Sequence, residues 1–210
     1  MKRRGAPPRD KPSQLRIIGG IWRGRKLSFL ARPGLRPTSD RVRETLFNWL
    51  APAVTGANCL DLFAGSGALG LEALSRGADH CDFIESDALA AKSIRDNLHM
   101  LEDASPRGRV DIIDAQTFIR SAQWPWDIVF VDPPFDDGTG TAILESLATH
   151  GCLHDGSWVY FETRSSAPEP VPESLYAVRK EKTAGDVLYR LLAPTSASQG
   201  GSFVGSSGLV

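Results

Sequence analysis

The sequence predicts a doubly wound α/β fold with a mostly parallel sheet, preceded by a small basic N-terminal extension. Three observations indicate this fold. Strand and helix patterns alternate from residue 58 to residue 149, as they do in repeated βα units. Residues 128–131 are all apolar, which is typical of a parallel strand buried on both faces. Glycines at 65, 67 and 70 directly follow one predicted strand and open a helix.

The first 50 residues are predicted to contain a tail, a hairpin and a helix. Residues 1–14 are basic and rich in proline, so we expect them to be disordered until a polyanion binds. Residues 15–30 predict a short hairpin. Thr38 or Ser39 is expected to cap a helix that runs to about residue 50 and holds the basic arm against the main domain. The helix has one apolar face, with Arg41 and Arg43 elsewhere, and the residues of that face are Val42, Leu46, Trp49 and Leu50.

Residues 51–192 are predicted to form the main domain. Its expected strands 59–62, 80–85, 109–113 and 128–131 alternate with helices 68–75, 88–98, 116–121 and 141–149. Strands at 158–162, 175–181 and 187–192 follow. The last two have no long helix between them, which predicts an antiparallel hairpin at the edge of the sheet. Residues 193–210 are rich in Gly and Ser and predict a flexible tail.

Positive and negative charges are segregated along the chain. Residues 1–43 hold 13 Lys and Arg against two acids, so this segment carries +11 while the remainder carries −12. A basic arm on an acidic body predicts a polyanionic partner for the arm. A merely solvated tail is the alternative. The apolar residues interleaved with the charges favour a partly folded basic surface, and they are Ile17, Ile18, Ile21, Trp22, Leu27 and Phe29.

Neither metal binding nor membrane insertion is indicated. Cys59, Cys81 and Cys152 lack CxxC spacing and nearby histidine pairs. Cys59 and Cys81 lie in predicted buried strands, so we interpret these two as small core residues. No apolar run reaches about 18 residues, and the N-terminus lacks the apolar segment of a signal peptide. We therefore expect a cytoplasmic protein without a membrane partner, and a monomer.

The glycine segment predicts a nucleotide-like cofactor. Glu85 ends the next strand, about 20 residues after Gly65, where such sites hold a ribose. Asp61 immediately precedes the loop and would be an awkward neighbour for a pyrophosphate. S-adenosylmethionine carries an amino group and a sulfonium instead, so Asp61 favours it over a dinucleotide. Asp114 follows the third strand and could accept from the adenine amino group or cap the short helix.

The strand at 128–131 ends in Asp132-Pro133-Pro134-Phe135. The prolines stiffen the loop and remove two backbone donors, leaving carbonyl oxygens. Asp132 and the Pro133 carbonyl could accept hydrogen bonds from an amino group, while Phe135 could stack on a flat ring. This predicts a pocket for the amino edge of a base, with an ordinary Asp-Pro turn as the alternative.

Together these segments resemble a known family. The run from Asp61 to Gly67 with Asp132-Pro133-Pro134-Phe135 is similar to class I S-adenosylmethionine-dependent methyltransferases that modify exocyclic amino nitrogens. More narrowly, residues 16–20, 22–27, 36–38 and 40–48 resemble the bacterial 16S rRNA (guanine(966)-N2)-methyltransferase family. The resemblance runs from about residue 15 to residue 192 and includes residues 182–185.

The resemblance implies a Rossmann-like sheet of seven strands, the last antiparallel, and methyl transfer to guanine N2 in 16S rRNA, within a partly assembled small subunit. It implies roles for two groups of residues. The cofactor would contact Asp61, Phe63, Gly65 and Gly67 with its methionine part, Glu85 with its ribose and Asp114 with its adenine. The guanine would contact Asp132, Pro133, Pro134 and Phe135.

Residues 15–50 are expected to bind the RNA. The candidates for phosphate contacts are Arg23, Arg25, Lys26, Arg36, Arg41 and Arg43, each with simple surface charge as the alternative. Two other functions stay open. Adenine-N6 methylation of DNA would use the same Asp-Pro-Pro-Phe pocket, and an RNA-binding assembly factor would need no turnover. A nicotinamide oxidoreductase is the weakest alternative.

Overall fold

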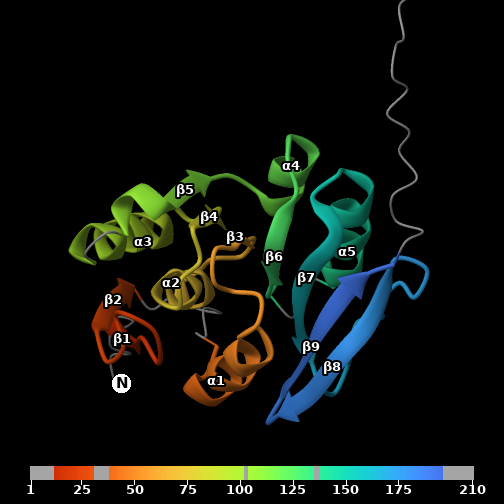
Figure 1. Cartoon of the computed structure of the whole chain (residues 1–210), viewed down its shortest axis with the longest axis horizontal. Coiled ribbons are helices and arrows are strands. Elements are labelled where there is room, and N and C mark those ends of the chain that lie inside the picture. The colour runs from red at the N-terminus through yellow and green to blue at the C-terminus, as the bar shows by residue number, and fades with distance from the viewer. Residues whose placement is uncertain (1–11, 31–37, 102–103, 135–137, 196–210) are drawn as a thin grey trace, which may run out of the picture.

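The computed structural model describes residues 12–30, 38–101, 104–134 and 138–195 (Figure 1). A separate hairpin pairs β1 (Pro12–Arg16) with β2 (Lys26–Leu30). The main sheet contains β3 (Asn58–Asp61), β4 (His80–Glu85), β5 (Gly108–Ile112), β6 (Trp126–Val131), β7 (Leu153–Arg164), β8 (Tyr176–Ala184) and β9 (Val187–Pro194). The helices are α1 (Asp40–Trp49), α2 (Ala68–Ser75), α3 (Ala88–Met100), α4 (Ala115–Arg120) and α5 (Gly140–Thr149), with a 3-10 turn η1 at Ser105–Arg107.

The strand order confirms a doubly wound, mostly parallel sheet of seven strands. The order is β5-β4-β3-β6-β7-β9-β8, and the five strands from β5 to β7 run parallel. Strand β9 runs antiparallel to both β7 and β8, so the predicted terminal hairpin is present. The order reverses between β3 and β6, and their carboxyl ends therefore border the crevice where such sheets bind ligands.

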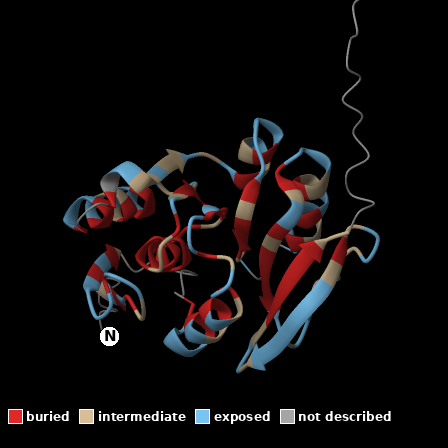
Figure 2. Cartoon of the chain, viewed as in Figure 1, coloured by how far each residue is buried: buried red, intermediate tan, exposed pale blue. Residues whose placement is uncertain are grey.

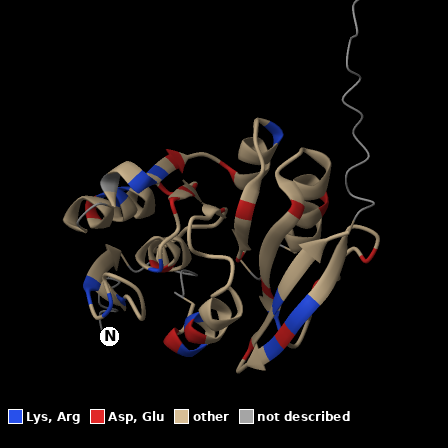
Figure 3. Cartoon of the chain, in the orientation of Figure 1, with Lys and Arg blue, Asp and Glu red and all other residues tan. Residues whose placement is uncertain are grey.

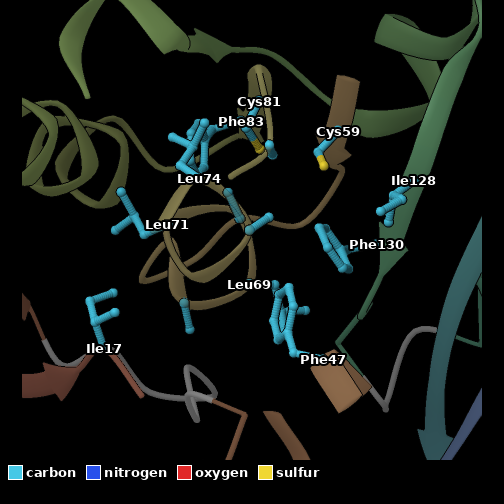
Figure 4. Close-up of a cluster of buried hydrophobic side chains, with 14 of the residues drawn as sticks. Ile17, Phe47, Cys59, Leu69, Leu71, Leu74, Cys81, Phe83, Ile128 and Phe130 are labelled. Carbon is cyan, nitrogen blue, oxygen red and sulfur yellow. The ribbon is translucent and has the colours of Figure 1, made fainter. Parts of the chain in front are cut away.

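The two faces of the sheet are covered by different helices, and a hydrophobic core lies on each (Figure 2). Phe130 of β6 points to the core that includes Phe47 of α1 and Leu69 of α2 (Figure 4). Val129 and Val131 point to the opposite core, against α5. This two-sided burial explains why residues 128–131 show no polar alternation. Cys59, Cys81 and Cys152 are free and buried in these cores, as predicted for Cys59 and Cys81.

Helix α1 begins as the sequence predicts, with one of the two candidate caps. The Ser39 hydroxyl accepts the Val42 N–H at 3.4 Å, so Ser39 is the N-cap, whereas Thr38 lies before the helix and contacts another element. Val42, Leu46 and Leu50 are buried on the predicted apolar face.

Both ends of the chain are ordered further than predicted. Residues 12–14, expected in the disordered tail, form part of β1, and residues 193–194, expected in the flexible tail, end β9. In each case pairing with a neighbouring strand fixes residues whose composition alone favours a loop. Residues 1–11 and 196–210 lie outside the described part of the chain. None of the helices in the described ranges combines the length and apolarity that a membrane crossing requires.

Candidate active site

Four acidic side chains gather at the carboxyl edge of the parallel strands. Asp61 ends β3, Glu85 ends β4, Asp132 directly follows β6, and Glu162 lies near the end of β7. The fold brings them together because adjacent strands end at the same edge of the sheet. Burial raises the pKa of Asp61, and the nearby Asp132 and Glu85 raise it further. This edge therefore concentrates acidic side chains, which a cationic ligand would favour in their ionised form.

The glycine segment forms the loop that joins β3 to α2. The Gly65 N–H donates to Glu85 Oε2 at 2.7 Å, and Glu85 Oε1 accepts the Asp87 N–H at 2.8 Å. Gly67 precedes α2 with a φ of 77°, a conformation that favours glycine. Gly70 has a packing role, since a Cβ there would lie 2.3 Å from the Phe83 ring. Glu85 therefore holds the loop in place.

Asp61 is the most buried acid of the site, with 2% of its surface exposed. Its Oδ2 accepts the Gly70 N–H at 3.0 Å. Burial, partly offset by this bond and reinforced by the nearby acids, raises the Asp61 pKa to about 7. No described Lys, Arg or His forms an ion pair with Asp61. A buried carboxylate without a cationic partner fits a ligand that brings its own positive charge.

Phe63 and Asp114, the two remaining predicted cofactor residues, follow β3 and β5 at the carboxyl edge of the sheet. Phe63 is half-buried in the β3–α2 loop and packs against the core on the α5 side. Asp114 is exposed and caps α4, where its Oδ1 accepts the Thr117 N–H at 2.9 Å. Of the two interpretations that the sequence left open for Asp114, the structure shows the helix cap. A second hydrogen bond, to a ligand at this edge, is compatible with the cap because a carboxylate has four acceptor positions.

Asp132 is held by the segment that precedes α1. The Thr38 hydroxyl donates to Asp132 Oδ2 at 3.2 Å. Burial raises the Asp132 pKa, and the Thr38 hydrogen bond partly lowers it. Pro133 is buried and Pro134 is exposed, while Phe135 lies outside the described residues. The structure thus joins the N-terminal segment to the predicted base pocket, a link that sequence reasoning did not find.

The prediction that Arg43 contacts RNA phosphate is wrong. Expected as a surface contact to phosphate, Arg43 is buried, with 1% of its side chain exposed. Its guanidinium donates to the Thr38 carbonyl at 3.2 Å and pairs with Asp40 and Glu72 at 2.6 and 3.4 Å. The helical pattern placed Arg43 off the apolar face of α1, but the hairpin and α2 cover that side, so no phosphate can reach it.

Glu72, absent from the predicted set, is the partner that makes this burial possible. It is completely buried in α2. Its two oxygens accept the Ile18 and Gly19 N–H groups, each at 2.8 Å, and the Arg76 Nε at 2.7 Å. Glu72 therefore ties the hairpin and α1 to the helix that begins at the cofactor loop. In the sequence, the only local sign of this buried role is that Glu72 is an acid among the apolar residues of α2.

Four predicted RNA-binding residues are exposed in the structure. Arg23, Arg25 and Lys26 lie on the hairpin and Arg41 lies on α1. Figure 3 shows Lys and Arg on both of these elements. The Arg25 guanidinium also donates to the Met100 carbonyl at 3.0 Å, which fixes its direction. Arg36 lies outside the described residues. A cavity of about 420 Å³ between β5 and the α4–β6 loop contains none of the predicted site residues.

The chain matches a protein family and curated relatives over most of its length. The model of a family described as "Conserved hypothetical protein 95" matches residues 15–193. "Ribosomal RNA small subunit methyltransferase D" of Escherichia coli K12 is 46% identical over 185 residues, 88% of this chain and 92% of that protein. The protein of the same name from Haemophilus influenzae is 43% identical over 180 residues, 85% and 93% of the two chains.

Solved structures show the same architecture. The Escherichia coli protein yhhF superposes with a TM-score of 0.78 at 46% identity, covering 87% of this chain and 98% of that one. HI0767 from Haemophilus influenzae gives a TM-score of 0.74 at 40% identity, with 86% and 98% covered. The similarity therefore spans both the N-terminal hairpin and the sheet.

Proposed function

The chain belongs to the family described as Conserved hypothetical protein 95, and we propose that it methylates the exocyclic N2 of a guanine in 16S rRNA with S-adenosylmethionine as methyl donor. The observation that carries the proposal is the acidic edge formed by Asp61, Glu85 and Asp132 next to the Asp-Pro-Pro turn. The curated relatives named as small-subunit rRNA methyltransferases match over most of the chain.

The described residues fit S-adenosylmethionine. Asp61 lacks a cationic partner among them and would face the positively charged methionine part, together with Phe63, Gly65 and Gly67. Glu85 would accept from the ribose hydroxyls, and Asp114 from the adenine amino group. When bound, the cofactor supplies an electrophilic methyl group on a sulfonium.

Asp132 and the Pro133 carbonyl position the nucleophile. Guanine N2 is a poor nucleophile because its lone pair is delocalised into the ring. Hydrogen bonds from its two N–H groups to these acceptors would localise the lone pair and orient the amino group for methylation. Asp132 would accept the proton that N2 loses when it is methylated. Holding the reactants in this geometry contributes about 7–11 kcal/mol in well-oriented systems.

The basic arm would bind the rRNA that carries the target base. Arg23, Arg25, Lys26 and Arg41 are exposed and suited to phosphate contacts. The target must leave its stack to reach Asp132, which favours an RNA loop within a partly assembled small subunit. Phe135 would then stack on the base. We place the protein in the cytoplasm, with its ribosomal substrate, and expect it to act as a monomer.

The test is methyl transfer from labelled S-adenosylmethionine to small-subunit particles from a strain that lacks the enzyme, with nucleoside mapping of the product. N2-methylguanine at one position is the expected result. N6-methyladenine in DNA, without transfer to the particles, would contradict the proposal in favour of a DNA methyltransferase. Binding of particles without any transfer would favour an assembly factor.

Thr38→Val is expected to lower methyl transfer about 10-fold near neutral pH, because Asp132 loses the hydroxyl that orients it and lowers its pKa. Asp132 accepts hydrogen bonds from N2 best when ionised. A higher Asp132 pKa therefore moves the acidic limb of the pH–rate profile to higher pH. The difference in transfer rate between Thr38→Val and wild type should for this reason become smaller as pH rises. Thr38→Ser retains the hydroxyl and should restore the wild-type profile. An unchanged acidic limb in Thr38→Val would contradict this role.

A further inference from the structure

Glu162 is a buried acid beside the proposed base pocket to which the mechanism above assigns no role. It is 5% exposed, and no described Lys, Arg or His forms an ion pair with it. An acid buried in this way lowers stability unless it is neutralised or hydrogen-bonded. Burial and the neighbouring Asp132 raise its pKa. Groups with perturbed pKa values cluster at functional sites.

The strand register places Glu162 next to Asp132. In the parallel pair β6–β7, Phe130 lies opposite Tyr160, and their two ring centroids are 6.4 Å apart. Side chains two residues further along each strand point to the same face. Asp132 and Glu162 therefore form the next pair, on the face where Thr38 contacts Asp132.

One oxygen of Glu162 is held by a hydrogen bond from a residue of the same strand. The hydroxyl of Tyr160, a fully buried residue, donates to Glu162 Oε2 at 2.5 Å. The carboxyl is thereby held in one orientation, as Thr38 holds that of Asp132. Two acceptor groups are thus held side by side at the edge of the sheet, each by a hydroxyl donor.

We propose that Glu162 is the residue that selects guanine, by accepting the N1–H of the base while Asp132 accepts from N2. This inference rests on the proposed function. Guanine presents N1–H and N2–H as adjacent donors, whereas adenine has an unprotonated N1 next to its amino group. An acceptor beside Asp132 therefore discriminates between two bases that the Asp-Pro-Pro-Phe turn alone accepts equally.

The experiment uses particles reconstituted with 16S rRNA that carries either guanine or 2-aminopurine at the mapped target position. 2-Aminopurine keeps the exocyclic 2-amino group but has no N1–H. In an assay at about pH 8.5, above the Glu162 pKa of about 8, most of the carboxyl is ionised. Wild-type enzyme is then expected to methylate the guanine particle with a kcat/KM about 10- to 100-fold higher, the range for one hydrogen bond to a charged group.

Glu162→Gln should reverse this preference. Tyr160 needs an acceptor, so the amide oxygen takes its hydroxyl and the NH₂ group faces the base. That donor opposes the N1–H of guanine and pairs with the N1 lone pair of 2-aminopurine. Guanine transfer should therefore fall about 10- to 100-fold while 2-aminopurine transfer rises. Glu162→Leu, which offers neither group, should bring the two rates to within about threefold.

The controls separate specificity from folding and from the proposed function itself. Glu145→Gln changes an exposed glutamate on α5 and should leave both rates unchanged. Thermal unfolding and S-adenosylmethionine binding should be unaffected in Glu162→Gln. A guanine to 2-aminopurine ratio that stays at the wild-type value in this variant would overturn the role of Glu162 alone. Wild-type enzyme that forms no N2-methylguanine would overturn the proposed function and this inference with it.

Discussion

Asp132→Ala is expected to lower methyl transfer by about 10³-fold or more while S-adenosylmethionine still binds. The substitution removes the carboxylate that orients N2 and accepts its proton, so both positioning and proton transfer are lost. The cofactor contacts assigned to Asp61 and Glu85 come from β3 and β4 and do not depend on Asp132. Single-turnover transfer to small-subunit particles and calorimetric titration with the cofactor measure the two effects separately.

The matched control is Asp127→Ala, which removes an acid next to the opposite end of the same strand. Asp127 accepts the Asn58 N–H at 2.7 Å and lies away from the carboxyl edge of the sheet. This variant should keep most of the transfer rate. Loss of both transfer and cofactor binding in Asp132→Ala, with the fold intact, would contradict the assignment and place Asp132 in the cofactor site.

Glu72→Leu is expected to lower the free energy of unfolding by about 3–5 kcal/mol, the range for breaking a buried ion pair by removing one partner. The change leaves the buried Arg43 guanidinium without one of its two acidic partners. It also removes the acceptor of the Ile18 and Gly19 N–H groups. Urea denaturation monitored by circular dichroism measures the loss.

A double-mutant cycle with Arg43→Leu separates the contribution of the Arg43–Glu72 ion pair from that of the other hydrogen bonds of Glu72. Replacing both partners with apolar residues should recover part of the lost stability, because no unpaired charge is then buried. Glu145→Leu on the exposed face of α5 is the control and should change stability by about 0.5 kcal/mol or less. A loss below about 1 kcal/mol in Glu72→Leu would show that the hairpin does not depend on this carboxylate.

The hydrogen bonds and ion pairs of Glu72 also connect the proposed RNA-binding surface to the proposed base pocket. They join the hairpin that carries Arg23 and Arg25 to α2, whose first turn follows the glycine loop. Arg43 extends the connection to the Thr38 carbonyl, and the Thr38 hydroxyl contacts Asp132. The proposed RNA-binding surface and the proposed base pocket are thus parts of one hydrogen-bonded structure. Glu72→Leu should for this reason also lower the affinity for small-subunit particles.

Local pattern alone determined the fold class and most elements. The predicted helix 68–75 and strand 80–85 coincide with α2 and β4. Apolar runs, glycines and caps act over a few residues, so a single sequence contains them in full. The same holds for Asp61 and Glu85, which end strands, and for Asp132, which directly follows one. All three must therefore lie at one edge of a parallel sheet.

Only the tertiary structure decided which charged residues are buried and which acids are neighbours. Arg43 looks like a surface residue along α1, but its partner Glu72 is 29 positions away and is brought close by packing. Glu162 lies beside Asp132 because of the β6–β7 register, which depends on the whole sheet. Burial and register are sums over contacts between distant segments, so neither is present in the local pattern. The sequence therefore determined the elements and the cofactor edge of the site, and the packed sheet decided how the base pocket is built.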